Sequence, residues 1–185
     1  MSRRGTDDGV TLVELLVSVA ILGLVTPVLM GSVVLGYRTT DATVDRLSDS
    51  RNRAIVPSLF VRDVQSATTV ATASGACEQA GDTLVVRLRW TTTPATGSAV
   101  TRVAAWVTTT SGGVTRLERR ACDDSSGSMT AVSSVTAAHG VIGAPSVACR
   151  AAGGAATACS SAVRVELSVT DSSGAFTTAG RRRAA

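Results

Sequence analysis

The chain has 185 residues, a formal net charge of +4 and 3% aromatic residues, and all 18 of its basic residues are arginine. This length fits one domain beyond an N-terminal anchor, and with so few aromatic residues the core must consist mainly of Val, Leu, Ile and Ala. The absence of lysine excludes pili that are joined by lysine isopeptide bonds. The only asparagine, Asn52, lies outside any N-glycosylation sequon.

Residues 10–36 form an apolar run that contains a single charged side chain, that of Glu14. At about 1.5 Å per residue the run would make a helix of about 40 Å, which is long enough to cross a bilayer. A carboxylate within such a segment costs about 2.5–3.5 kcal/mol on insertion scales. A plain membrane anchor has no need of this group, so we expect Glu14 to be functional and to have a partner.

The residues before the run, MSRRGTDDG, form a short polar leader that ends at Gly9. A secretory signal peptide is cut after its apolar region, whereas here the polar-to-apolar junction precedes that region. Cleavage after Gly9 would place the new amine on Val10. Glu14 would then be the fifth residue of the mature chain, about one helical turn from that amine.

The string from Gly9 to Val17, GVTLVELLV, resembles the class III signal of type IV prepilins and type II secretion pseudopilins. The resemblance implies that a membrane-embedded prepilin peptidase cuts after Gly9. It makes Val10, which stands where Phe is usual, the candidate for N-methylation. It also implies that Glu14 pairs with the N-terminal amine of a neighbouring subunit during assembly.

The function that this resemblance implies is structural rather than enzymatic, with no cofactor and no metal: a minor pilin or pseudopilin of a type IV pilus or a type II secretion pseudopilus. The implied partners are other pilins, the prepilin peptidase and an inner-membrane assembly platform. The implied location is the cell membrane, crossed once with the head extracytoplasmic, and then a surface pilus or pseudopilus. Two alternatives are a DNA-uptake (competence) pilin whose head binds DNA, and a simple membrane-anchored extracytoplasmic domain.

Beyond residue 36 the pattern becomes amphipathic, with apolar residues such as Val44 and Leu47 at helical spacing. A proline inside a helix removes one hydrogen bond, so we expect a kink at Pro27 and an interruption or a restart at Pro57. The sequence therefore predicts one long helix with breaks, from Val10 to about Gln65. Its first half would be embedded in lipid or in a filament core, and its second half would pack on a globular head.

The remainder of the chain is rich in strand patterns. Alternating apolar and polar residues, or short β-prone runs, predict strands at 84–90, 101–109, 114–122, 163–169 and 175–178. Ser111, Gly112 and Gly113 predict a hairpin turn between the second and third of these. The segment 123–161 is mostly Ser, Gly, Ala and Thr, which predicts a long loop with only brief strand-like pieces.

The four cysteines all lie beyond the apolar run, and an even number in an extracytoplasmic domain indicates disulfides. The candidates are Cys77, Cys122, Cys149 and Cys159, which allow three pairings. We favour Cys77–Cys122 and Cys149–Cys159, because the second bond would close a small loop that is too poor in large apolar groups to order itself. A zinc site is the alternative, although no C-x₂-C pair is present.

No catalytic constellation is recognisable. His139 is the only histidine and has no nucleophile motif to serve. Asp123 and Asp124 raise the possibility of calcium, but the EF-hand pattern is absent. The run Arg181–Arg183 reads either as a solvated basic tail or as a contact for an anionic surface or DNA. No aromatic residues interleave with these arginines to stack bases, which weakens DNA binding.

Together these features predict an α+β protein in which a long N-terminal helix, transmembrane in its first half, packs on an antiparallel β-sheet head. The predicted segments are a leader (1–9), a transmembrane or filament-core helix (10–36), its amphipathic continuation (37–67) and a β-rich head (68–185). The order of elements, with the strings RDVQSA at 62–67 and TRLERR at 115–120, is similar to the larger minor pseudopilins of the J type and to PilW-like minor pilins.

Overall fold

A computed structural model describes residues 11–75, 77–93, 95, 97–124 and 129–183, with the backbone alone at 38–42, 124 and 129. The chain divides into two compact units, Met1–Val44 and Asp45–Ala185. In the first unit, the described residues from Leu12 onward form the N-terminal part of one helix. The second, the head, contains the rest of that helix and all the strands.

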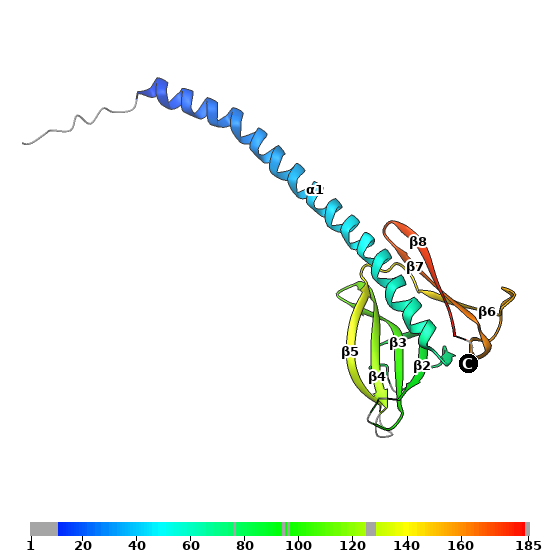
Figure 1. The fold of residues 1–185 in the computed structure, drawn as a ribbon. Coiled ribbons are helices and arrows are strands. Elements are labelled where there is room, and N and C mark those ends of the chain that lie inside the picture. The colour runs from blue at the N-terminus through cyan, green and yellow to red at the C-terminus, as the bar shows by residue number, and fades with distance from the viewer. Residues whose placement is uncertain (1–10, 76, 94, 96, 125–128, 184–185) are drawn as a thin grey trace, which may run out of the picture. The chain divides into compact units, whose positions relative to one another are not determined.

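The long helix, α1, runs without a break from Leu12 to Ser66 (Figure 1). The interruption expected at Pro57 is therefore wrong. A proline costs the helix one hydrogen bond, to the carbonyl four residues earlier. Val56 and Phe60, which flank it, are completely buried, and burying one such side chain contributes about 1.5–3 kcal/mol. Packing on the head thus outweighs the lost bond. The helix is also continuous through Pro27, where the kink stays a prediction.

Eight strands and one short 3₁₀ helix follow. They are β1 (Thr69–Ala71), β2 (Thr83–Thr92), β3 (Val100–Ser111), β4 (Val114–Asp124), β5 (Met129–Ala138), β6 (Ser146–Arg150), η1 (Cys159–Ser161), β7 (Arg164–Asp171) and β8 (Gly174–Arg181). All the pairings are antiparallel. The strands form two sheets, a five-stranded one in the order β1-β2-β3-β4-β5 and a three-stranded one in the order β6-β7-β8, rather than the single sheet expected.

The hairpin between β3 and β4 forms where the glycines predicted it. Ser111 pairs with Val114, and Gly112 and Gly113 both have positive φ, at 59° and 76°. A two-residue turn with both central residues in the left-handed region matches the twist of the flanking strands, and glycine adopts that conformation without strain.

The long loop predicted for residues 123–161 is wrong, because this segment contains the ten-residue strand β5 and the strand β6. β5 lies at the edge of the five-stranded sheet and pairs only with β4. Its side chains from Thr130 to Val135 are exposed. An exposed edge strand needs little apolar surface. The Ser, Thr and Ala content of β5 therefore led to the prediction of a loop.

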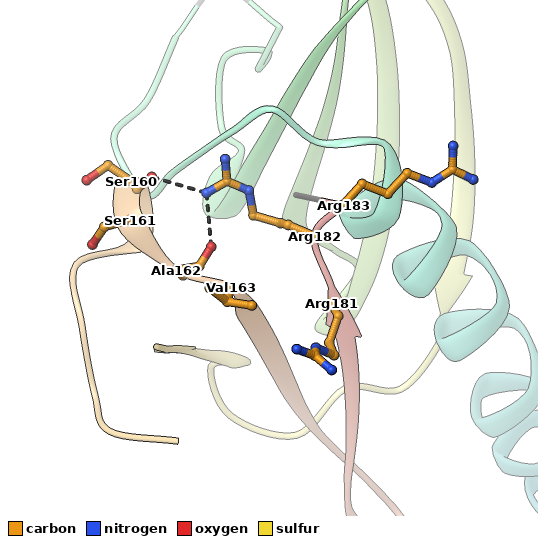
Figure 2. A pocket seen from close by; sticks show the side chains of 7 residues that line it. All are labelled: Ser160, Ser161, Ala162, Val163, Arg181, Arg182 and Arg183. Carbon is orange, nitrogen blue, oxygen red and sulfur yellow. Dashed lines mark hydrogen bonds between the residues drawn. The ribbon is translucent and has the colours of Figure 1, made fainter. Parts of the chain in front are cut away.

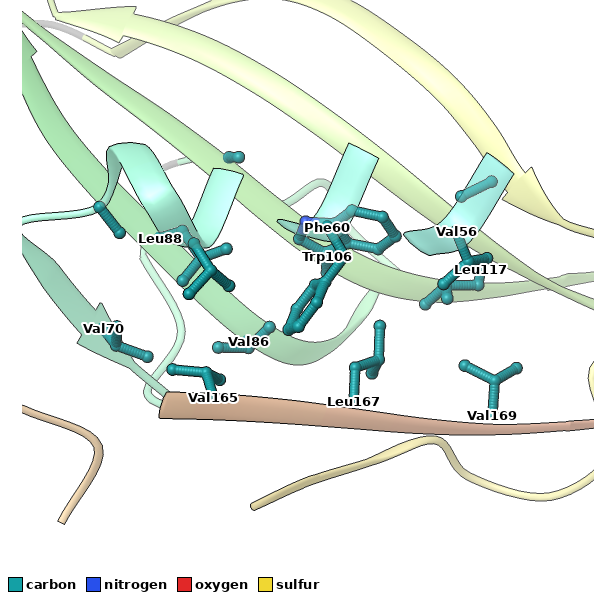
Figure 3. Close-up of a cluster of buried hydrophobic side chains, with 14 of the residues drawn as sticks. Val56, Phe60, Val70, Val86, Leu88, Trp106, Leu117, Val165, Leu167 and Val169 are labelled. Atoms are coloured by element: carbon teal, nitrogen blue, oxygen red, sulfur yellow. The ribbon is translucent and has the colours of Figure 1, made fainter. Parts of the chain in front are cut away.

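The main core lies where the C-terminal part of α1 packs against both sheets (Figures 1 and 3). Phe60 of α1 and Trp106 of β3 pack edge to face, with ring centroids 5.4 Å apart. Leu167, from the middle of β7, points toward these rings from the second sheet in Figure 3. Because aromatic pairs of this geometry are worth about 0.5–1.5 kcal/mol beyond their buried area, this pair is a major anchor of α1 on the head.

The buried face of α1 differs from the expected one. Leu47 is 71% exposed, whereas three polar residues, Asp49, Asn52 and Asp63, are buried. The core-facing positions of α1 are 49, 52, 56, 60, 63 and 64, which recur at helical spacing. The helix is therefore amphipathic, as expected. Part of its buried face, however, consists of hydrogen-bonded polar side chains instead of apolar ones.

Candidate functional site

The N-terminus of α1 is capped by Thr11. The Thr11 hydroxyl accepts a hydrogen bond from the backbone N–H of Glu14 at 3.3 Å, and the Thr11 carbonyl accepts one from Leu15 at 3.1 Å. The first of these bonds is the N-cap hydrogen bond that a threonine side chain makes to the third N–H of a helix. The sequence analysis did not identify this role of Thr11, although the Thr-x-x-Glu spacing before an apolar run is a recognisable signal.

Glu14 occupies the first turn of α1 and is exposed. A negative charge is favourable near the positive end of the helix dipole. No residue in the described part of the chain donates a hydrogen bond to its carboxylate or forms an ion pair with it, so within these residues the carboxylate is available to an external partner. The predicted cleavage residues, Gly9 and Val10, lie outside the described residues, as does the rest of the leader.

The N-terminal part of α1 presents an apolar surface all around its axis. Leu12–Tyr37 is long and apolar enough to cross a membrane, with a mean hydropathy of 2.4. Its large apolar side chains are between 48% and 77% exposed. A helix of this kind is stable in lipid or packed among other apolar helices, and in water it would expose a surface that soluble proteins avoid.

Polar side chains within this apolar segment satisfy their hydrogen bonds locally. The hydroxyls of Ser18, Thr26 and Ser32 donate to the carbonyls of Glu14, Leu22 and Val28, four residues earlier, at 2.6–2.9 Å. Hydrocarbon offers no water to hydrogen-bond these groups, so such internal bonds make the segment compatible with a membrane. No such bond satisfies the Glu14 carboxylate among the residues that the structure describes, and it is the one charged group of the segment.

On the head, the cysteines form two disulfides, Cys77–Cys122 and Cys149–Cys159, the pairing that the sequence analysis favoured. Since all four are oxidised, none is a thiolate, and the zinc alternative is excluded for these residues. The first bond ties Cys77, which follows β1, to Cys122 of β4, next to a small second core on the opposite face of the five-stranded sheet. The second closes the loop that leads into η1.

The other candidate groups serve the fold. The backbone N–H and carbonyl of His139 are both hydrogen-bonded to the amide of Asn52, at 3.0 Å each. Asp123 forms an ion pair with Arg102 at 3.4 Å. Within the described residues no group of three or more His, Cys, Asp or Glu side chains could hold a metal ion. These contacts connect α1 with the β5–β6 segment and β3 with β4.

The basic C-terminal run does not behave as a uniform solvated tail. Arg182 donates hydrogen bonds to the carbonyls of Ser160 at 3.1 Å and Ala162 at 3.0 Å (Figure 2). It also donates to the carbonyl of Ala67 at 3.3 Å and to that of Thr68. Its guanidinium therefore joins the end of α1 to η1. The neighbouring Arg181 and Arg183 are exposed.

The comparison with protein families gives one finding. Residues 6–26 match the model of the prokaryotic N-terminal methylation motif. The matched region includes Gly9, Val10, the Thr11 cap and Glu14. No curated protein and no solved structure matches the chain significantly. The motif, together with the apolar span and the α+β fold, supports a membrane-anchored protein of the type IV pilin-like or pseudopilin-like kind.

Proposed function

We propose that this pilin-like chain is a structural subunit of a type IV pilus or a type II secretion pseudopilus, a minor pilin or pseudopilin processed between Gly9 and Val10. The observation that carries the proposal is Glu14, a carboxylate in the first turn of an exposed apolar helix and within the matched motif. The motif belongs to structural subunits rather than to enzymes, in keeping with a chain that has no recognisable catalytic constellation.

The partner of Glu14 in this proposal is the amine of Val10 from a neighbouring subunit. Processing creates that amine, which is cationic at neutral pH and lies about one helical turn along the axis from Glu14 of its own chain. A neighbouring subunit shifted axially by about one turn would bring its amine level with Glu14. Pairing offsets the cost of holding a carboxylate in an apolar environment. The pair would then set the axial position of each incoming subunit.

The apolar surface of Leu12–Tyr37 supplies the rest of the assembly contact. Before assembly, lipid covers this surface. During assembly, the helices of neighbouring subunits replace the lipid, so apolar groups stay out of water throughout. Its small residues, such as Gly23 and Gly31, have no side-chain neighbour within 4 Å and would let other helices approach closely.

The head lies outside the cytoplasm in this proposal. Its two disulfides support that location, because disulfides persist in oxidising compartments and are rare in the cytosol. The membrane would be crossed once, and the assembly platform and prepilin peptidase would act on the N-terminal segment from within the membrane.

The finer assignment, a minor subunit of the J type, also belongs to the proposal. It rests on the strings at 62–67 and 115–120, which lie far apart in sequence. In the fold they meet, because Asp63 of the first and Arg119 of the second form a buried ion pair. This contact supports the view that the two strings form one structural unit of the head.

The two alternatives have less support. A simple anchored domain gives Glu14 no partner. A DNA-uptake pilin has less support because no aromatic residues interleave with the C-terminal arginines to stack bases, and the guanidinium of Arg182, one of the three, is already bound to backbone carbonyls. We therefore propose the structural role first.

Processing tests this proposal. The full chain would be co-expressed with a prepilin peptidase, and the mature N-terminus determined by mass spectrometry. We expect Val10 as the first residue, with no cleavage in a Gly9→Leu variant. A Gly5→Leu variant, altered in the same leader but away from the junction, is the matched control and should be processed normally. A mature chain that begins elsewhere, or no processing of the wild type, would refute the assignment.

A further inference from the structure

A series of adjacent surface pockets follows one end of the head. Trp90 lines two of them, with volumes of about 230 and 400 Å³. Arg183 lines the 400 Å³ pocket and also a pocket of about 440 Å³. Arg181 lines that 440 Å³ pocket and also one of about 200 Å³. Neighbouring pockets share wall residues, so together they make one series along the surface. We call it the arginine groove, lined in part by Trp90, Arg102, Arg164, Arg181, Arg182 and Arg183.

Part of the charge in this groove is compensated by carboxylates. Arg102 pairs with Asp123 at 3.4 Å, and Arg164 pairs with Glu166 at 3.1 Å. Arg181 and Arg183 differ, since both are exposed and neither forms an ion pair or a side-chain hydrogen bond with any residue that the structure describes. The groove thus carries two guanidinium groups whose charge is not neutralised by those residues.

The backbone that bears these two arginines is held in place by Arg182 between them. Its side chain binds the carbonyls of Ser160 and Ala162, and its backbone N–H donates to Val163 at 2.8 Å. Figure 2 shows the Arg182 side chain pointing toward Ser160 and Ala162. The side chains of Arg181 and Arg183 point away from these residues, in two different directions. Such fixing of the backbone lowers the entropy lost when a ligand binds to the two free arginines.

We propose that the arginine groove binds an extended acidic segment of a partner protein, whose carboxylates pair with Arg181 and Arg183. Guanidinium groups form bidentate, charge-assisted hydrogen bonds with carboxylates, which makes arginine well suited to this recognition. Pockets of 200–440 Å³ accommodate individual side chains along a peptide.

Single-stranded nucleic acid, a different anionic polymer, fits this surface less well. It binds by stacking its bases on exposed aromatic side chains as well as by phosphate contacts. Trp90 is the aromatic residue of the groove, and it is partly buried against the main core. Phe60 and Trp106 are fully buried. An acidic peptide needs no stacking platform and is the occupant that these charges favour.

The test uses the full chain solubilised in detergent and a fluorescent octaglutamate peptide, with binding followed by anisotropy at low and at physiological salt. We expect an Arg181→Gln/Arg183→Gln double variant to bind about tenfold or more weakly, the loss of one to two charge-assisted pairs. The matched control, Arg46→Gln/Arg51→Gln, removes the same charge from two exposed arginines on α1 and should bind like the wild type.

Intact disulfides and unchanged circular dichroism would show that both variants are folded. Equal weakening in the two double variants would overturn the proposal in favour of general charge attraction, and no binding by the wild type would also overturn it. Tighter binding of an oligothymidine of equal length, dependent on the same two arginines, would identify nucleic acid instead. This readout needs no filament, so it is independent of processing and assembly.

Discussion

Asp63 of α1 and Arg119 of β4 form a bidentate ion pair inside the head, with Nε–Oδ2 at 2.6 Å and Nη2–Oδ1 at 2.8 Å. The side chains are 2% and 10% exposed. The indole N–H of Trp106 donates to the same carboxylate at 3.1 Å. The buried charge of Asp63 is tolerated because both of its carboxylate oxygens are hydrogen-bonded. The ion pair thereby fixes the last turns of α1 on the five-stranded sheet.

Removing one partner of this pair should destabilise the head strongly. An Asp63→Ala variant leaves the Arg119 charge buried and unpaired, and we expect a loss of about 3–5 kcal/mol in the free energy of unfolding. Chemical denaturation of the detergent-solubilised protein measures it. An Arg102→Gln variant, which breaks the more exposed pair with Asp123, should change stability by less than about 1 kcal/mol. Similar effects of the two variants would contradict the assigned role of the buried pair.

Replacing Pro57 with alanine should stabilise the protein. Helix α1 passes through Pro57 without a break, so the proline lacks one hydrogen bond and has the lowest helix propensity of any residue. We expect Pro57→Ala to raise the free energy of unfolding by about 1–3 kcal/mol. Thermal unfolding followed by circular dichroism would detect the change, and Ser58→Ala, one position along, serves as the control. Destabilisation by Pro57→Ala would mean that the proline is required for the helix path.

The close approach of β8 to α1 requires glycine at position 180. A Cβ added there would lie 2.6 Å from the Cβ of Val64, which is fully buried. Overpacking of this kind costs about 1–3 kcal/mol, so Gly180→Ala should lower the unfolding midpoint. Gly153→Ala, with nothing within 4 Å of the added atom, is the matched control and should be neutral. Equal unfolding midpoints for the two variants would show that α1 and β8 can move apart without loss of stability.

The two disulfides should contribute unequally. They join residues 45 and 10 positions apart, for Cys77–Cys122 and Cys149–Cys159 respectively. On the chain-entropy model their removal costs about 4 and about 3 kcal/mol. Paired Cys→Ser variants, compared by denaturation under non-reducing conditions, test this order. The reverse order would indicate that the Cys149–Cys159 loop supports more of the head, for example through the contacts between Arg182 and the η1 region.

Much of the fold followed from local patterns. The long apolar run predicted α1, and the glycine pair predicted the β3–β4 hairpin, because both signals are strong and local. The edge strand β5 was missed, since an exposed strand needs no apolar stripe. The buried face of α1 was misjudged for a tertiary reason: Asp49, Asn52 and Asp63 are buried because of partners far along the chain, which no local pattern indicates.

The candidate site was more accessible to sequence reasoning than the head. Glu14 stands out as the one charge in an apolar run, and its importance follows from the cost of burying it. The Thr-x-x-Glu spacing in the sequence could have predicted the Thr11 cap. No sequence pattern could have predicted the hydrogen bonds of Arg182, because its acceptors are backbone carbonyls, which every residue type carries.

Incorporation of a Glu14→Gln variant into filaments tests the central claim most directly. Gln keeps the size and shape of Glu but has no charge. In host cells, mature subunits would be quantified in sheared filaments and in membranes. We predict normal processing at Val10 but incorporation lowered by about tenfold or more, because the ion pair with the neighbouring amine is lost. An Asp45→Asn variant, which removes one exposed charge elsewhere on α1, should assemble normally. Wild-type incorporation of the Glu14→Gln variant would contradict the account.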